Sequence, residues 1–224
     1  MKTWGDLEIP TSLADVCRPD RMALIVYDMQ VGIVSQVGSG AAITEHVARV
    51  LAAARANGFR VIFTRHLSMP MKLMGRFQMR QAMAWQGVAE PIQVQPWFLR
   101  DSAGFQIVPE LVPQSDEAVF DKLAFSAFEG TPVEMVLRDC GLIAFAIVGI
   151  ATEIGIDPTV RHGADLGLIP VVVQDACGAG DAAAAERSLA NIAFSGDAVM
   201  TDGAALCSAM AQPGGSRATK PDHR

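Results

Sequence analysis

The chain has 224 residues, of which 50% are hydrophobic and 19% are charged. This composition excludes a disordered chain and is typical of a protein with a large buried core. The net charge of −6, without a stripe of Lys and Arg side chains, gives no reason to expect a nucleic-acid partner.

Apolar runs alternate with amphipathic stretches from residue 22 onward. MALIVYD (22–28) predicts a fully buried strand that ends at Asp28. Residues 40–58 place apolar side chains on one helical face and close with Asn57-Gly58, a helix stop signal. The later elements continue the alternation, with strands at 60–66, 118–122, 143–149, 170–176 and 198–201 and helices at 131–141, about 154–166 and about 181–193.

Strands that alternate with helices predict βαβ units and a parallel sheet covered on both faces. Residues 67–117 fit this alternation poorly and are long for a connection, so we expect short helices packed over the edge of the sheet as a functional lid. We expect one domain over residues 1–212. The polar, Gly/Pro-rich remainder, 213–224, is expected to be disordered.

The cysteines and the apolar stretches indicate where the protein works. The four cysteines lie far apart without CxxC spacing, which favours reduced thiols over a disulfide or zinc framework. The N-terminus lacks the apolar core of a signal peptide, and the longest apolar stretches are about half as long as a membrane span. We therefore expect a cytoplasmic protein without a membrane partner.

Three features fall at the carboxyl ends of predicted strands, where open parallel sheets bind their ligands. Asp28 closes the first strand, Lys122 closes the third, and Gly155 opens the helix after the fourth. A carboxylate, an ammonium and the free N–H groups of a helix N-terminus suit acid–base chemistry and anion stabilisation. The structural alternatives are a helix N-cap or solvated strand end for Asp28 and a surface position for Lys122.

Five stretches resemble the isochorismatase-like superfamily, whose larger branch is the cysteine hydrolases. In the family's order they are ALIVYDMQ (23–30), VIFTRH (61–66), FDKLAFSAFEGT (120–131), AIVGIATEIGIDPTVRHGADLG (146–167) and VVVQDACGAGD (171–181). The resemblance implies a three-layer, Rossmann-like α/β fold with a six-stranded parallel sheet of order 3-2-1-4-5-6. It also implies a site beside the first and fourth strands. In the family, the residues that match Asp28 and Lys122 join a cysteine in a catalytic triad, and the cysteine hydrolyses amides through a thioester.

Gly155 stands where that cysteine would be, and a glycine cannot form a covalent intermediate. Isochorismatases proper, which cleave a vinyl ether, also carry glycine there, and their Ile-Gly pair is matched by Ile154-Gly155. By that resemblance a protonated Asp28 would donate a proton to the vinyl carbon, and water would add to the cation. We expect the space of the missing thiol to hold substrate or water, and the Gly155 N–H to be available to a ligand.

Two departures argue against isochorismate itself as the substrate. Isochorismatases carry Trp-Arg-Tyr after the lysine, whereas this chain has Leu123-Ala124-Phe125 and lacks the arginine that suits a dicarboxylate. Thr152-Glu153 stands where isochorismatases have Ala-His, and threonine is the amidase-like choice. We therefore expect a small, less anionic substrate. Six residues are expected to bind it: Gln30, Trp85, Phe125, Ala151, Thr152 and Ile154.

Several residues admit both a functional and a structural interpretation. Gln30 either orients near Asp28 or anchors a loop. Cys177, at the end of the fifth strand, is interpreted as a small buried hydrophobe rather than a relocated nucleophile. His66 follows the second strand, where nicotinamidases bind a metal through Asp-x-His, but no second histidine is near. We therefore expect no metal and no other cofactor.

The stretch MPMKLMGRFQMRQAMAW (69–85) is rich in methionine. One interpretation is core packing of a helix, and the other is an adaptable apolar wall of the pocket. Its three basic side chains would bind a single carboxylate or face solvent.

Together these observations predict a hydrolase that acts on a vinyl ether, an amide or a related C–O or C–N bond of a small organic molecule. Water attack would be assisted by Asp28, without a covalent intermediate. Two alternatives stay open: an inactive relative that binds a small molecule or a partner subunit, and a cysteine amidase that uses Cys177. The retained pair of Asp28 and Lys122 favours the enzyme. A homodimer or homotetramer is expected.

Overall fold

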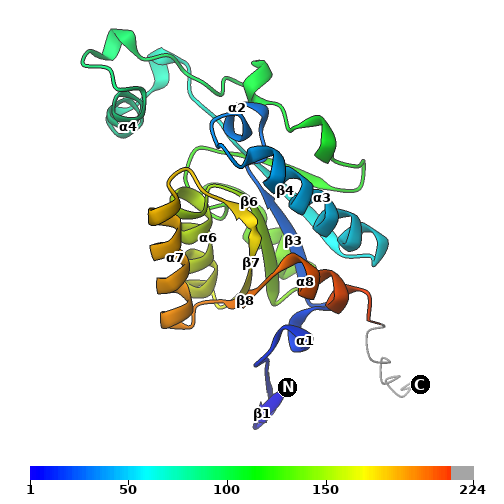
Figure 1. Ribbon diagram of the computed structural model, residues 1–224. Coiled ribbons are helices and arrows are strands. Elements are labelled where there is room, and N and C mark those ends of the chain that lie inside the picture. The colour runs from blue at the N-terminus through cyan, green and yellow to red at the C-terminus, as the bar shows by residue number, and fades with distance from the viewer. Residues whose placement is uncertain (213–224) are drawn as a thin grey trace.

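The computed structural model describes residues 1–212 and centres on a six-stranded parallel sheet (Figure 1). Numbered along the chain within this sheet, the strand order is 3-2-1-4-5-6, so the expected fold class and order are confirmed. The order reverses between the first and fourth strands, which is where such sheets bind ligands. In spatial order the strands are β5 (Ala118–Lys122), β4 (Arg60–His66), β3 (Met22–Tyr27), β6 (Ala144–Ile150), β7 (Ile169–Gly178) and β8 (Val199–Thr201).

The two central strands, β3 and β6, are buried along their whole length. Every residue of MALIVY in β3 and of AFAIVGI in β6 is buried. The two strands pair in parallel from Met22 opposite Ala144 to Tyr27 opposite Gly149. Such continuous apolar runs are typical of parallel strands that helices cover on both faces.

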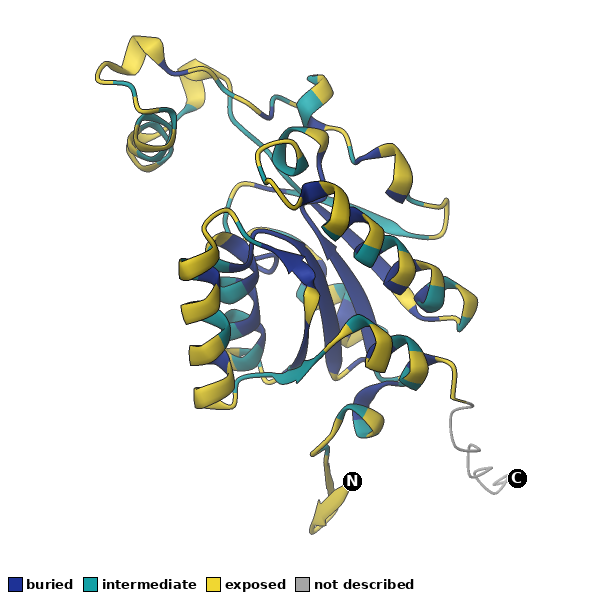
Figure 2. Cartoon of the chain, viewed as in Figure 1, coloured by how far each residue is buried: buried dark blue, intermediate teal, exposed yellow. Residues whose placement is uncertain are grey.

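Helices cover both faces of the sheet and complete the three layers (Figures 1 and 2). On one face, α3 and α8 bury side chains such as Val47 and Leu206 against the strands. On the other face, α5, α6 and α7 bury Leu137, Val160 and Ile192. The helices of residues 1–212 are α1 (Leu13–Val16), α2 (Val31–Val34), α3 (Gly40–Ala56), α4 (Arg76–Gln86), α5 (Val133–Asp139), α6 (Asp157–Asp165), α7 (Ala182–Ser195) and α8 (Gly203–Met210).

The end of β3 and the start of the helix after β6, both at the carboxyl edge of the sheet, differ from the expected bounds. β3 ends at Tyr27 because Asp28 adopts a left-handed backbone with φ of 48° and turns the chain out of the sheet. The helix expected from about residue 154 begins as a π-helical turn, η5 (Thr152–Ile156), that leads into α6. An antiparallel hairpin of β1 (Lys2–Trp4) and β2 (Leu7–Ile9) adds to the expected elements.

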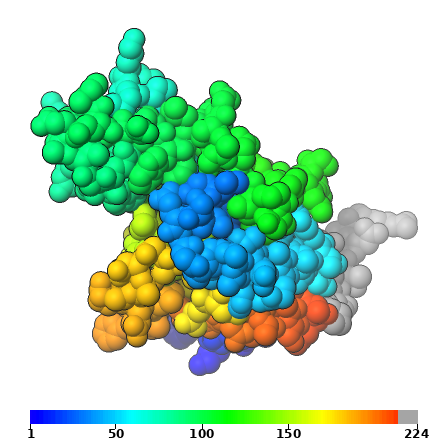
Figure 3. All heavy atoms as spheres, turned by 45° about the horizontal axis from the view of Figure 1, so that its top comes forward, coloured from blue at the N-terminus to red at the C-terminus, as the bar shows by residue number. Residues whose placement is uncertain are grey.

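Residues 67–97 form an arm that leaves the end of β4 and extends away from the sheet (Figures 1 and 3). It holds η1 (Met71–Leu73), α4 and η2 (Pro91–Gln93). Short helices are confirmed here, but α4 buries none of its residues. The interpretation of 69–85 as core packing is therefore wrong, because the helix stands off the sheet instead of lying on it.

The rest of the expected lid returns to the body of the protein. There, η3 (Ala103–Phe105) contacts α2, and η4 (Pro109–Leu111) contacts α3. Within residues 1–212 no helix has the length and apolar character needed to cross a membrane. The tail expected to be disordered, 213–224, lies outside the described residues.

Candidate active site

The carboxylate and the ammonium expected at strand ends lie side by side. Asp28 follows β3, Lys122 ends β5, and the Lys122 Nζ is 2.7 Å from the Asp28 Oδ2. Both residues are buried, with 3% and 2% of their surface exposed. The structure therefore excludes a solvated strand end for Asp28 and a surface position for Lys122.

The Asp28 carboxylate accepts a hydrogen bond on each oxygen. The Thr64 hydroxyl, from β4, donates to Oδ1 at 2.7 Å, and Lys122 donates to Oδ2. An ionised carboxylate only accepts hydrogen bonds, so two donors match its charged form. The expected protonated Asp28, ready to donate to a vinyl carbon, does not match this pattern. The arrangement suits a carboxylate that takes up a proton.

Lys122 uses its whole ammonium group inside the protein. Besides Asp28, it donates to the Tyr27 hydroxyl at 2.7 Å and to the Ala124 carbonyl at 3.2 Å. Burial lowers the pKa of Lys122, and the Asp28 carboxylate opposes that shift. Because each of its three N–H groups has an acceptor, the buried ammonium keeps hydrogen bonds in place of those it would make to water.

Tyr27 fills the space beside Gly155. A Cβ atom at residue 155 would lie 1.9 Å from the Tyr27 hydroxyl oxygen. That hydroxyl donates to the Phe125 carbonyl and accepts from Lys122. The expectation that the missing thiol leaves room for substrate or water is therefore wrong, because a phenol has taken that room. The Gly155 N–H is also engaged, since it donates to the Ala151 carbonyl at 3.0 Å.

A cavity of about 300 Å³ opens at this edge of the sheet, with Asp28 and Gly155 in its wall. The arm closes one side, where Trp85 faces Phe125 with ring centroids 6.1 Å apart. Lys122 is not part of the wall and lies behind Asp28 and Tyr27. The aromatic side chains of the wall are Tyr27, His66, Trp85, Trp97, Phe98 and Phe125.

The matching sequence and fold decide the family of the chain. Residues 22–204 match the family model described as the isochorismatase domain. The chain belongs to the isochorismatase family. The fold agrees: the crystal structure of a cysteine hydrolase from Pseudomonas syringae pv. phaseolicola gives a TM-score of 0.75 at 27% identity. That match covers 86% of this chain and 93% of the other.

Curated relatives of this isochorismatase-family chain are hydrolases of C–N bonds by name. Ureidoacrylate amidohydrolase RutB from Klebsiella pneumoniae is 29% identical over 203 residues, which cover 78% of this chain and 80% of that protein. The protein of the same name from Serratia proteamaculans is 28% identical over 225 residues, covering 87% and 85%. The chain is thus a hydrolase of the isochorismatase family.

The structure brings four of the six expected substrate-binding residues to the cavity wall: Trp85, Phe125, Ala151 and Ile154. Gln30 lies elsewhere, fully buried, where its side-chain amide donates to the carbonyls of His66 and Phe105 and accepts from the His66 N–H. Gln30 is therefore a loop anchor, the alternative that the sequence left open.

Thr152 is the other expected residue that the structure does not bring to the wall. It is fully buried, and its hydroxyl donates to the Gly178 carbonyl at 2.9 Å. The bond ties η5 to the end of β7, because Thr152 begins the π-helical turn and Gly178 ends the strand. Thr152 therefore positions the backbone around Gly155 and does not face a substrate.

His66 lines the cavity at the point where the arm begins. Its ring stands edge-on to Phe98, with centroids 6.0 Å apart. Burial, together with the positive charge of Lys122, lowers the pKa of His66 to about 4. Its imidazole is therefore neutral near pH 7 and can both donate and accept hydrogen bonds. Over residues 1–212 no three His, Cys, Asp or Glu side chains gather as a metal site requires.

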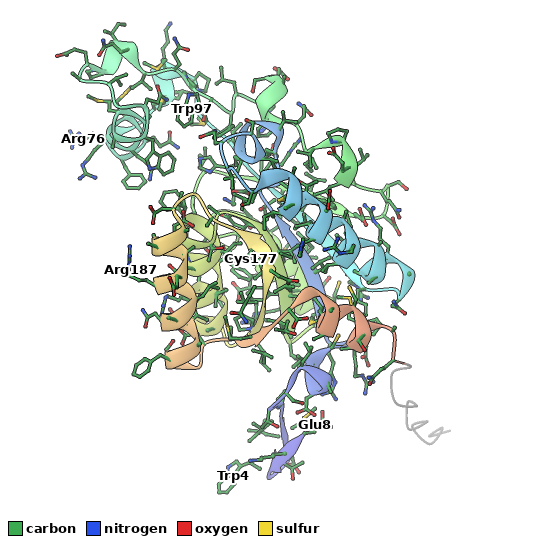
Figure 4. The ribbon with its side chains drawn as sticks, viewed as in Figure 1. Trp4, Glu8, Arg76, Trp97, Cys177 and Arg187 are labelled. Carbon is green, nitrogen blue, oxygen red and sulfur yellow. The ribbon has the colours of Figure 1, made fainter. Side chains whose placement is uncertain are left out.

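The thiols lie away from the cavity wall. Cys177 sits among the strands (Figure 4), where its Sγ donates to the Ile147 carbonyl at 3.6 Å. Burial raises the pKa of Cys177 to about 12, so the thiolate is scarce near neutral pH. None of the four cysteines, all within the described residues, lines the cavity. The structure thus disfavours the cysteine amidase that uses Cys177.

The sequence reasoning missed Tyr27, Trp97 and Phe98 as parts of the site. A signal for Tyr27 was present: it is the only tyrosine of the chain and stands at the end of an otherwise aliphatic strand, next to Asp28. A phenol in a fully buried strand needs hydrogen-bond partners, which points to a polar corner. Trp97 and Phe98 carried no local signal, because they reach the cavity only through the return of the arm.

Proposed function

We propose that the protein hydrolyses a C–N bond of a small organic molecule by direct attack of water, without a thioester. One observation carries the proposal: the Asp28 carboxylate reaches the cavity in an acceptor-only arrangement, while none of the four thiols lines that cavity. A carboxylate held in this way can serve as a general base for water.

The reaction can be written with Asp28 as the group that moves the proton. Asp28 takes a proton from water as the water oxygen bonds to the carbonyl carbon of the substrate, and the π electrons of the C=O bond move onto its oxygen. When the tetrahedral adduct collapses, the C–N bond breaks and the nitrogen takes the proton from Asp28. Lys122 keeps the carboxylate oriented between the two steps, because it holds Oδ2 at 2.7 Å.

The cavity wall favours a substrate with a ring and without a carboxylate. Six of its side chains are aromatic, and neither a lysine nor an arginine is among its residues. Ala124, where the resemblance has an arginine in isochorismatases, adds no positive charge. Aromatic walls bind flat rings, whereas an anionic group beside Asp28 would be repelled. Relatives named ureidoacrylate amidohydrolase favour the amide or ureide bond over a C–O bond.

The proposal is tested with a panel of neutral aryl amides and aryl ureas, followed by mass spectrometry of the products. We expect turnover, one ¹⁸O atom from labelled water in the acid product, and no mass added to the protein during turnover. Asp28→Asn should lower kcat by about 10²–10⁴-fold, the usual range for general acid–base catalysis. A protein adduct during turnover, or an Asp28→Asn variant with unchanged kcat, would contradict the proposal.

A second candidate, an inactive relative that binds a small molecule, is favoured by the Tyr27 phenol in the place of the nucleophile. It predicts that members of the same panel raise the melting temperature of the protein while none is turned over. Turnover of any member excludes it.

A further inference from the structure

Tyr27 is the functional side chain of the cavity that neither the family match nor the proposed base accounts for. It belongs to the cavity wall, and its hydroxyl abuts Gly155, the position that the sequence resemblance gives to the nucleophile of cysteine hydrolases. The ring also lies over Lys122, whose Nζ is 4.3 Å from the ring centroid. Tyr27 therefore connects the charged pair to the space where a substrate would bind.

We propose that the Tyr27 hydroxyl is a catalytic hydrogen-bond donor that stabilises the oxyanion formed when water adds to the substrate. This inference rests on the proposed hydrolysis and assigns the group that receives the developing negative charge. A donor aimed at that charge is worth more in the transition state than in the substrate complex.

The hydrogen bonds of the phenol fix the direction in which its proton points. The oxygen accepts from Lys122 at 2.7 Å, so the single O–H proton is directed to another acceptor. In the free protein this acceptor is the carbonyl of Phe125, a residue that itself lines the cavity. A substrate oxygen that replaced this carbonyl would receive the same proton. The bond from the ammonium makes the phenol a stronger donor, because linked hydrogen bonds polarise one another.

The surroundings of Tyr27 keep the phenol protonated. Its titratable neighbours are Asp28, which follows it in the chain, and Lys122 from β5. Burial and the charge of the Asp28 carboxylate raise the pKa of Tyr27 well above its ordinary value. The phenol is thus a donor at neutral pH and not a nucleophile. It shares its proton with the oxyanion and keeps it when the adduct collapses, so Asp28 remains the group that transfers a proton.

The geometry also explains why a glycine is required at position 155. Any side chain there would begin 1.9 Å from the Tyr27 hydroxyl oxygen. Thr159 and Ala151 hold this backbone in place, since the Gly155 carbonyl accepts from the Thr159 hydroxyl at 2.6 Å and the Gly155 N–H donates to Ala151. The glycine at 155 and the tyrosine at 27 are thus two parts of one arrangement.

The first test is Tyr27→Phe, which removes the hydroxyl and keeps the ring in the wall. With a neutral aryl amide that the wild type turns over, kcat should fall by about 10²–10³-fold while KM changes by less than about threefold. Thr44→Val serves as the control, because it removes a buried hydroxyl of α3 that does not line the cavity, and it should leave kcat unchanged. An unchanged kcat in Tyr27→Phe overturns the proposal.

A second test uses the fact that the chain contains one tyrosine. Biosynthetic replacement by 3-fluorotyrosine labels Tyr27 alone and gives a more acidic phenol. We expect the alkaline limb of the kcat profile to move to lower pH, which a purely structural role would not cause. Benzamide, used as a probe, should shift the single ¹⁹F resonance. An unmoved limb, or an unmoved resonance when benzamide saturates the site, would contradict the assignment.

The two proposals fail in different ways. If Asp28→Asn loses activity while Tyr27→Phe retains it, the hydrolysis stands and the role of Tyr27 falls. If the wild type turns over none of the panel, the hydrolysis falls. The catalytic role of Tyr27 then falls with it, and the ¹⁹F shift with benzamide shows only whether Tyr27 contacts a bound amide.

Discussion

The cavity is built from two regions that differ in how the chain supports them. The corner formed by Asp28, Thr64 and Lys122 lies at the ends of sheet strands, and all three residues are buried. Across the cavity, the arm of residues 67–97 supplies Trp85 and Trp97, although Val94 is its one buried residue.

Under the proposed function, the corner carries out the chemistry and the arm recognises the substrate. In the corner, each polar group depends on another that is also removed from solvent, so a substitution disturbs both the charge balance and the fold. In the arm, the aromatic side chains face a cavity or solvent, and a substitution changes what the cavity binds with little effect on the fold.

Lys122→Met should produce the largest loss of stability, because it leaves the Asp28 carboxylate buried without its partner. Removing one member of a buried pair costs about 3–5 kcal/mol of unfolding free energy. Urea denaturation measures the change. The control, Met135→Ala on α5, alters a side chain that is 67% exposed and should stay within about 0.5 kcal/mol of the wild type. A loss below about 1 kcal/mol in Lys122→Met would mean that the corner carries no buried charge pair.

The pH dependence of stability should report on His66, which joins the two regions. Its pKa is about 4 in the folded protein and 6.5 without burial, so the unfolded chain binds more protons between these values. The free energy of unfolding should therefore fall as pH drops from 6.5 to 4, with a slope of up to about 1.4 kcal/mol per pH unit.

Urea titrations at several pH values test this slope in the wild type and in His66→Gln, which should lose it. His46→Gln removes a partly exposed imidazole of α3, and this variant should keep the slope of the wild type. If His66→Gln retains the full slope, another group titrates in this range and the burial of His66 is not its cause.

Trp85→Ala should have the smallest effect on stability, within about 0.5 kcal/mol, since α4 buries none of its residues. Its effect should appear instead as a raised KM for an aryl amide, because the ring facing Phe125 is lost. Ile92→Ala, at a side chain of the same arm that is 87% exposed and outside the wall, should change neither value. A melting temperature lowered as far as in Lys122→Met would show that the arm supports the fold.

The fold was predictable from the sequence where burial is uniform along an element. MALIVYD and IAFAIVG have the pattern of central parallel strands, and the family resemblance supplied the strand order. The hairpin of β1 and β2 was missed because three-residue strands carry no periodicity that a sequence can show. The position of α4 was missed for a different reason: spacing shows that a helix is amphipathic but not where its apolar side points.

The sequence predicted which residues lie at the site where the residue type and its place at a strand end both indicated a functional role. Asp28, Lys122 and Gly155 do lie together, and their catalytic roles remain predictions. The volume that the missing thiol should have freed was not predictable, because Tyr27 fills it from a different strand. Gln30 and Thr152 were assigned to the substrate on their place in the motif, whereas their polar atoms bond to backbone groups at the ends of β4, η3 and β7.

The contact between Tyr27 and Gly155 also limits how the two positions can change through single substitutions. A relative with cysteine at 155 must lose that side chain before it can gain a tyrosine at 27, since a Cβ would lie 1.9 Å from the hydroxyl oxygen. This chain must likewise replace its tyrosine before position 155 can hold a thiol. In both directions the mutational path passes through a form with glycine at 155 and a smaller residue at 27, which has neither nucleophile nor phenol. A single Gly155→Cys substitution therefore places the new side chain against the Tyr27 hydroxyl.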